Sequence, residues 1–187
     1  MPTPARILAV SLACAAVIPG RASASASAST GARGFDRARP YLAFAPGGVI
    51  VPLNREPLVP TAYVWGVDGG YHFAFGRFKV QPGALFEHST YRETWLAVHW
   101  VRLGPQVRVG GGGRRLFGYG SLGLLLDVFH MTRAGYRGTW VRAHPTVGAG
   151  LQGSVRDRLL VGGEAAVDAV GDLALHLRLR VFLGVLF

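Results

Sequence analysis

Apolar and polar residues alternate along most of the chain after residue 40, and the C-terminal stretch shows this most clearly. The odd-numbered positions from Leu173 to Phe187 are all Leu, Val or Phe, whereas the even-numbered positions between them include His176, Arg178 and Arg180. In a helix the odd-numbered set would spread around the whole surface, but in a strand it lies on one face. The pattern therefore predicts a strand with one apolar face and one charged face.

The same test, with Gly, Pro and clusters of polar residues taken as strand boundaries, predicts seven further strands. Their ranges are Tyr41–Val51, Ala62–Phe73, Arg77–His88, Trp95–Val109, Leu116–Phe129, Thr139–Gln152 and Leu159–Asp168. The range 41–51 has no clear polar face. Short connections at 74–76, 110–113 and 156–158 alternate with longer ones at 52–61, 89–94 and 130–138. This organisation predicts an antiparallel meander of eight strands.

The first residues of the chain have the pattern of an export signal. A short basic start is followed by an apolar run from Ile7 to Ile18 and by a string of small residues with Ala-Ser repeats. We interpret residues 1–28 as a cleaved signal peptide, because about 12 apolar residues span only about 18 Å of helix against a hydrocarbon core of roughly 30 Å. The single cysteine, Cys14, would leave with this leader. Residues 29–39 are predicted to be a flexible segment before a domain at 40–187.

Composition and charge exclude several classes of protein. The 187 residues are 50% hydrophobic with a formal net charge of +10, which argues against a disordered chain. After the leader, no window is long and apolar enough for a membrane-crossing helix. The basic residues are spread over the predicted strands instead of clustered, so we do not expect a nucleic-acid partner.

Charges on the predicted strands share one face and nearly balance in sign. A soluble barrel would place its apolar faces inward and its charged faces outward. Here the opposite charges on the polar faces can neutralise each other in the interior, so the apolar faces can point outward. We therefore predict an all-β fold, an eight-stranded antiparallel up-and-down transmembrane β-barrel with lipid outside and a filled, salt-bridged lumen inside. The residues expected in this lumen network are Asp68, His72, Lys79, Glu87, Arg102, Arg108, Asp127, Arg142, His144, Glu164, Asp168, His176, Arg178 and Arg180.

The leader, the eight alternating strands and the terminal pattern Val181-x-Leu183-x-Val185-x-Phe187 resemble the small outer-membrane β-barrel proteins of Gram-negative bacteria, of the OmpA-barrel and OmpX type. This resemblance implies that Val181, Leu183, Val185 and Phe187 form the C-terminal signal read by the barrel assembly machinery. It also implies an outer-membrane location, with the short turns in the periplasm and the longer loops outside. We expect a monomer whose partners are outer-membrane lipids and lipopolysaccharide.

Candidate chemistry in the sequence is sparse. Arginines in the expected outer loops, Arg55, Arg92, Arg133 and Arg137, are suited to the phosphates of lipopolysaccharide or simply to solvent. The inward histidines have no close metal-ligand spacing, so no metal site, cofactor or catalytic residue is predicted. Deacylases of lipid A resemble the chain in architecture, but His88 and Ser89 are adjacent and would lie on opposite faces.

We predict a structural or surface-interaction role. Three alternatives remain open: a lipid A-modifying enzyme of the deacylase or acyltransferase type, a narrow channel, and a secreted lipocalin-like carrier.

Overall fold

The computed structural model describes residues 36–53, 61–93, 96–113, 115–133, 135–169 and 175–187. The predicted signal peptide, residues 1–28 with Cys14, and Arg55 lie outside the described residues. All regular structure in the described part is β-strand. The strands are β1 (Asp36–Pro52), β2 (Ala62–Phe75), β3 (Phe78–Glu93), β4 (Leu96–Gly112), β5 (Leu116–Arg133), β6 (Tyr136–Val155), β7 (Leu159–Ala169) and β8 (Leu175–Leu186).

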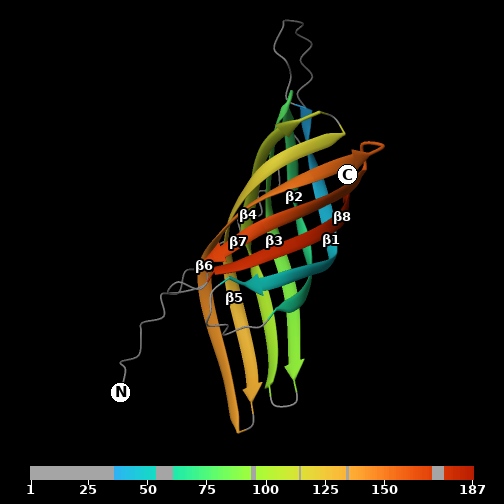
Figure 1. The fold of residues 1–187 in the computed structure, drawn as a ribbon. Helices are drawn as coiled ribbons and strands as arrows, with labels where there is room; N and C mark the ends of the chain where they lie inside the picture. Colours follow the sequence, from blue (N-terminus) through green and yellow to red (C-terminus); the bar gives the residue numbers. More distant parts are fainter. Residues whose placement is uncertain (1–35, 54–60, 94–95, 114, 134, 170–174) are drawn as a thin grey trace, which may run out of the picture. The chain divides into compact units, whose positions relative to one another are not determined.

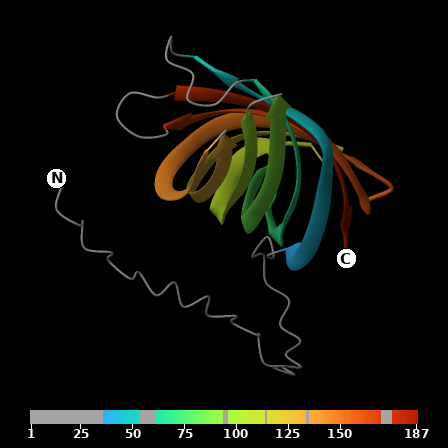
Figure 2. The ribbon, with the colours of Figure 1, turned by 90° about the horizontal axis from the view of Figure 1, so that it is seen from below.

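The eight strands form one closed barrel in chain order (Figure 1). Every neighbouring pair is antiparallel, and β1 closes the ring by pairing with β8 from Tyr41↔Leu186 to Pro52↔His176. Seen from below in Figure 2, the strands curve around a single lumen. The predicted all-β, eight-stranded up-and-down barrel is therefore confirmed. No helix in the described ranges is long and apolar enough to cross a membrane.

The two ends of the barrel differ. At one end, which we call the turn end, tight connections join β2 to β3, β4 to β5 and β6 to β7. Gly76 there has a φ of +67°, and Arg156 and Asp157 have φ values of 52° and 55°, a left-handed pair that fits a two-residue reversal between twisted strands. The opposite end, the hairpin end, carries the connections from β3 to β4 and from β5 to β6.

Two connections expected as loops are largely strand. The ranges 89–94 and 130–138 were predicted as longer loops, but β3 continues to Glu93 and β5 and β6 continue to Arg133 and Tyr136. Cross-strand pairing runs on without a break to Glu93↔Leu96 and Arg133↔Tyr136, because each strand edge supplies backbone partners for the next. In Figure 1 these two hairpins reach lowest, beyond the rim of the other strands.

β1 departs from the prediction in two ways. It begins at Asp36, inside the segment 29–39 that was expected to be flexible, because Asp36 and Arg39 pair with Ala74 and His72 of β2. Register shifts at Phe44/Gly47 and Ala45/Gly48 mark a bulge in β1. A bulge adds one residue and resets the inward–outward alternation, which explains why the sequence of this range shows no continuous polar face.

Inward glycines make room for large rings in the lumen. A Cβ atom on Gly150 would lie 2.5 Å from the hydroxyl oxygen of Tyr119, and one on Gly162 would collide with the ring of Phe182. Both rings are buried, at 5% and 1% exposure. Glycine at these positions therefore fills the barrel with aromatic side chains from the neighbouring strands instead of leaving the space empty.

Candidate functional site: a charged lumen inside an apolar surface

The outward surface changes from apolar to polar at one level of the barrel. Across β3, β4, β5 and β6 the cross-strand pairs align four outward residues per level. Moving toward the hairpin end, successive levels read Phe86, Leu103, Leu126 and Ala143; His88, Val101, Val128 and Val141; Thr90, His99, His130 and Thr139; then Arg92, Ala97, Thr132 and Arg137. Such a sharp change, at the same register position on four neighbouring strands, is typical of a membrane boundary.

Outward aromatic residues on β2 mark both edges of this apolar band. Trp65 lies beside His88 at the polar boundary, with ring centroids 5.5 Å apart, and Phe75 lies at the turn end beside Phe78. The ten residue steps from Trp65 to Phe75 span about 33 Å along a strand and, at a tilt of about 40°, about 25 Å in height. That height matches the apolar band of outer-membrane barrels, roughly 25 Å.

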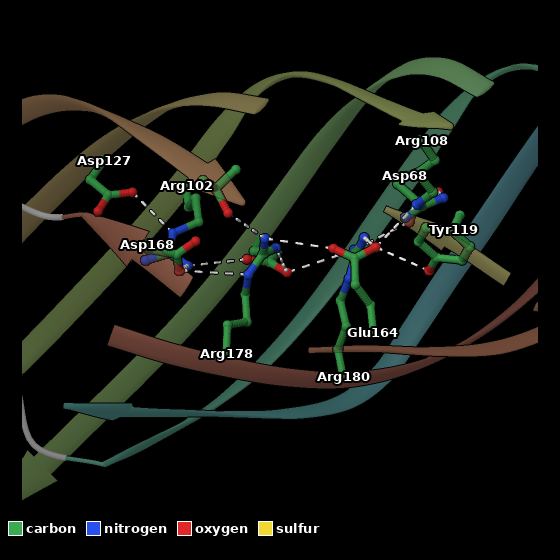
Figure 3. Close-up of polar contacts among 11 residues, drawn as sticks. Asp68, Arg102, Arg108, Tyr119, Asp127, Glu164, Asp168, Arg178 and Arg180 are labelled. Atoms are coloured by element: carbon green, nitrogen blue, oxygen red, sulfur yellow. Dashed lines mark hydrogen bonds and ion pairs between the residues drawn. The ribbon is translucent and has the colours of Figure 1, made fainter. Parts of the chain in front are cut away.

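The lumen is held together by four arginines from two opposite strands. Arg102 and Arg108 come from β4, and Arg178 and Arg180 come from β8, which lies across the barrel. Between them lie five buried carboxylates on β2, β3, β5 and β7: Asp68, Glu87, Asp127, Glu164 and Asp168. Figure 3 shows the four arginines and four of the carboxylates, Asp68, Asp127, Glu164 and Asp168, as a row along the lumen.

The half of the network nearer the hairpin end centres on Arg102 and Arg178. Arg102 donates from Nε to Asp127 at 3.0 Å and from Nη1 to Asp168 at 2.6 Å, and its guanidinium lies 4.3 Å from the Trp100 ring centroid. Arg178 donates to Glu87 at 2.8 Å. A guanidinium offers donors in a planar fork, so one arginine can join carboxylates from several strands.

The half nearer the turn end centres on Arg108 and Arg180. Arg108 holds both oxygens of Asp68, at 3.2 and 2.8 Å, and donates from Nε to Glu164 at 3.1 Å. Arg180 contacts the same two carboxylates at 3.1 and 3.2 Å. The hydroxyl of Tyr119 adds a 3.1 Å hydrogen bond to Glu164. Two arginines therefore share two carboxylates across the barrel.

This network fills the middle of the barrel. Arg102, Arg108 and Arg178 are each 1% exposed or less, although they are among the largest side chains in the protein. Eight strands enclose a space just wide enough to be filled by side chains. Because breaking one partner of a buried ion pair costs roughly 3–5 kcal/mol, the arrangement favours a fixed, closed lumen.

Four predicted lumen residues, a lysine and three histidines, do not take part in the arginine–carboxylate pairs. Lys79 is buried near the turn end and donates to the carbonyl oxygen of Gly113 at 3.0 Å. His72 pairs with Gln81 at 2.7 Å in the same region. At the other end, His144 lies 3.4 Å from Asp127, and His176 packs edge-on against Trp100.

The structure places the side chain of Arg142 outside the lumen, contrary to the prediction. Its parity on β6 is inward, opposite Asp127, but its side chain is exposed. Between Tyr136 and Ala143, β6 extends beyond the barrel rim at the hairpin end. His144 is the first buried residue along it from that end. Alternation alone gives the face of a strand but not the height at which the barrel wall ends.

Uncharged partners of the network were missed by the sequence analysis. Thr146 accepts a hydrogen bond from Arg178 at 3.3 Å, and Trp100 stacks on Phe129 with centroids 4.7 Å apart. The alternation of inward and outward positions places both residues inward, and this could have identified them. Arg178 contacts Glu164 and Asp168 at 3.8 and 3.6 Å and Arg180 contacts Glu164 at 3.2 Å, but the shortest carboxylate contact of Arg178 is with Glu87.

His88 and Ser89 lie on opposite faces of β3, as their adjacency predicted. Ser89 is buried in the lumen and donates to the carbonyl oxygen of Tyr63 at 2.7 Å, while His88 points outward and stacks on His99 at 6.4 Å. Within the described residues, no group of three or more His, Cys, Asp or Glu side chains is placed to hold a metal ion.

Solved structures with the same architecture come from bacterial outer membranes. Ail, the attachment invasion locus protein of Yersinia pestis, superposes with a TM-score of 0.61 at 13% identity, covering 83% of this chain and 100% of Ail. The fold is the outer-membrane β-barrel. The N-terminal barrel domain of Pseudomonas aeruginosa OprF gives a TM-score of 0.56 at 16% identity, covering 82% of this chain and 100% of that domain.

Neisserial surface protein A also gives a TM-score of 0.56, at 11% identity, covering 82% of this chain and 99% of that barrel. No protein-family model and no curated protein sequence matches the chain. At these identities the likeness establishes the fold of this outer-membrane-type barrel and nothing finer.

The terminal pattern lies on the lipid-facing side. Val181, Leu183, Val185 and Phe187 all point outward and are exposed, with Phe187 exposed by 67%. Phe187 also donates its backbone N–H to Pro40, which anchors this end against β1. Recognition of the pattern by an assembly machinery stays a prediction.

Proposed function

We propose that this chain is an integral protein of the bacterial outer membrane with a structural or surface-interaction role. The observation that carries the proposal is the outer surface: an apolar band about 25 Å high between aromatic edges, wrapped around a buried ion network. A secreted carrier would need the opposite arrangement, with an apolar cavity inside and charge outside. Fractionation tests this point, since recovery in the soluble periplasmic fraction would contradict the proposal.

The hairpin end is proposed to face outward from the cell and to contact lipopolysaccharide. Arg92 and Arg137 are exposed on the same level of β3 and β6, one step beyond the histidine level that marks the membrane boundary. Arginines at headgroup height are placed to bind phosphate groups bidentately. Arg133, exposed at the end of β5, extends the cationic surface.

Orientation is testable because the predicted mature chain has no cysteine. A membrane-impermeant maleimide added to intact cells should label Arg137→Cys at the hairpin end and leave Arg77→Cys at the turn end unlabelled until the cells are lysed. The parent chain serves as the blank. The reverse pattern would overturn the proposed orientation.

Lipopolysaccharide binding is tested by a matched pair of variants. Binding of purified barrel to immobilised lipopolysaccharide should fall at least fivefold in Arg92→Gln/Arg137→Gln. It should stay unchanged in Arg77→Gln/Arg115→Gln, which removes the same charge from the other end. An equal loss in both would mean that overall charge, and not the hairpin surface, drives binding.

Three further partner and activity assignments belong to the proposal. The terminal residues are proposed to be read by the barrel assembly machinery, the protein to act as a monomer, and the lumen to conduct no ions, because large buried arginines occupy it. Steady single-channel conductance of the parent protein in a planar bilayer would contradict the closed lumen and restore the narrow-channel alternative.

A further inference from the structure

The turn end of the barrel opens into a cavity of about 440 Å³ lined by cationic side chains. Arg39, Arg77, Lys79 and Arg115 line it, and Asp157 is the one carboxylate among its described lining residues. Arg39 belongs to β1 and Lys79 to β3, and the others come from the turns that join β2 to β3, β4 to β5 and β6 to β7. The cavity is thus the mouth of the barrel itself and not a crevice between two strands.

The charge of this mouth contrasts with the lumen behind it. In the lumen, four arginines face five carboxylates within ion-pairing range. At the mouth, the structure records no Asp or Glu carboxylate within 4 Å of Arg77, Lys79 or Arg115 among the side chains it describes. The same barrel therefore neutralises its cations in one compartment and concentrates them in the next.

Two of the four cations already have partners. The ammonium of Lys79 donates to the Gly113 carbonyl oxygen at 3.0 Å and lies 5.3 Å from the ring centroid of Phe117. Arg39 donates from Nε to a backbone oxygen of Phe187, the last residue of the printed sequence, at 3.3 Å. The contacts of Lys79 are with neutral groups, so they hold its ammonium in place and leave its positive charge uncompensated.

The cavity is blind. Phe117 lies between Arg115 and Tyr119 along the inward face of β5, is 2% exposed, and stacks on Tyr119 with centroids 5.4 Å apart. Tyr119 in turn donates to Glu164 of the ion network. A ligand that enters the mouth thus meets an aromatic floor with the ion network behind it, which suits binding and not passage.

We propose that this mouth is a binding site for a small, water-soluble molecule that carries two or more oxyanion groups, phosphate or carboxylate. Four cationic side chains against one carboxylate side chain, with Phe187 at the chain end contacting one of the four, leave an excess of more than one positive charge, and guanidinium groups match both kinds of oxyanion bidentately. The volume lies within the range of small-molecule sites, about 300–1,000 Å³. The compartment that supplies the ligand, the periplasm, rests on the orientation proposed above, whereas the binding chemistry does not.

The test uses the full barrel in a non-ionic detergent at 0.15 M NaCl, titrated calorimetrically with inorganic pyrophosphate and, in a second arm, with citrate. We expect saturable binding of at least one of them. The Kd should rise at least tenfold in Arg77→Gln/Arg115→Gln and stay within twofold in Arg92→Gln/Arg137→Gln. Binding by pyrophosphate alone assigns phosphate, and binding by citrate alone assigns carboxylate.

Amide chemical shifts locate the site independently. Pyrophosphate or citrate should move the signals of Gly112 and Gly113 at the turn end and leave that of Gly135 at the hairpin end in place. Absence of saturable binding of either anion at millimolar concentration overturns the proposal. So does an equal loss in both double variants. Because Arg77 and Arg115 are exposed, their replacement should leave the folded gel mobility unchanged, which is measured first.

Discussion

Replacing Arg108 with Met removes the side chain that joins β4 to β2 and β7 at the centre of the barrel. Arg108 is fully buried and makes three hydrogen bonds to Asp68 and Glu164, at 2.8–3.2 Å. Both carboxylates keep Arg180, at 3.1 and 3.2 Å. We therefore expect a loss near the lower end of the range for breaking a buried ion pair, about 3 kcal/mol.

The assay is urea unfolding of the barrel in detergent or lipid vesicles, followed by tryptophan fluorescence. With a denaturant slope of about 2 kcal/mol per molar urea, the midpoint should fall by about 1.5 M. The matched control is Arg142→Met. Alternation places Arg142 on the same inward face, but its side chain is exposed, so its loss should change stability by less than about 0.5 kcal/mol.

A double-mutant cycle separates the ion pair from other effects of the substitution. Combining Arg108→Met with Asp68→Asn should cost at least about 1 kcal/mol less than the sum of the single changes, because the two side chains interact directly. Additive losses, or equal effects of Arg108→Met and Arg142→Met, would refute the reasoning that the buried network stabilises the barrel.

Four further outcomes are expected, two for charged substitutions on the outer surface and two for inserted methyl groups. Leu179→Arg places a charge on the lipid-facing surface in the middle of β8 and should cost about 2–4 kcal/mol, seen as a smaller folded fraction on heat-modifiable gels, whereas Val155→Arg at the turn end should cost about 0–1 kcal/mol. Gly150→Ala should lower the unfolding midpoint by an equivalent of about 1–3 kcal/mol, because the added methyl group meets Tyr119. Gly120→Ala, whose nearest neighbour would be 3.8 Å away, should have little packing effect in the same assay.

Alternation was sufficient to predict the strands wherever one face was uniformly apolar. β8 has such a face, and its inward and outward residues follow from the sequence alone. β1 contains a bulge, so its pattern breaks although the strand continues. The ends of β3 and β5 were placed too early because polar residues beyond the membrane boundary look like loop residues, while their backbones remain paired.

Pairing partners in the lumen were beyond the reach of the sequence. Parity gave the inward face of Arg178, but its shortest carboxylate contact, Glu87, lies 91 residues away in the chain. Which arginine meets which carboxylate depends on barrel closure and stagger, and neither is encoded in local alternation. The cationic mouth was missed for the same reason: Arg39 belongs to a predicted flexible segment, Arg77 begins a predicted strand and Arg115 lies between a turn and the next strand, so nothing local brings them together.

The placement of the arginines on β4 and β8 has a consequence for how the barrel folds. Before β8 docks, the lumen side of β2–β7 presents two arginines to five carboxylates. The contacts of Arg180 with Asp68 and of Arg178 with Glu87 reach β2 and β3, and they form only when β8 also meets β1. An open sheet therefore retains unpaired acidic groups facing a space about to lose its water, which is unfavourable. Pairing of β8 with β1 and neutralisation of the interior charges therefore occur in a single cooperative step. Partly closed forms should be short-lived in the membrane.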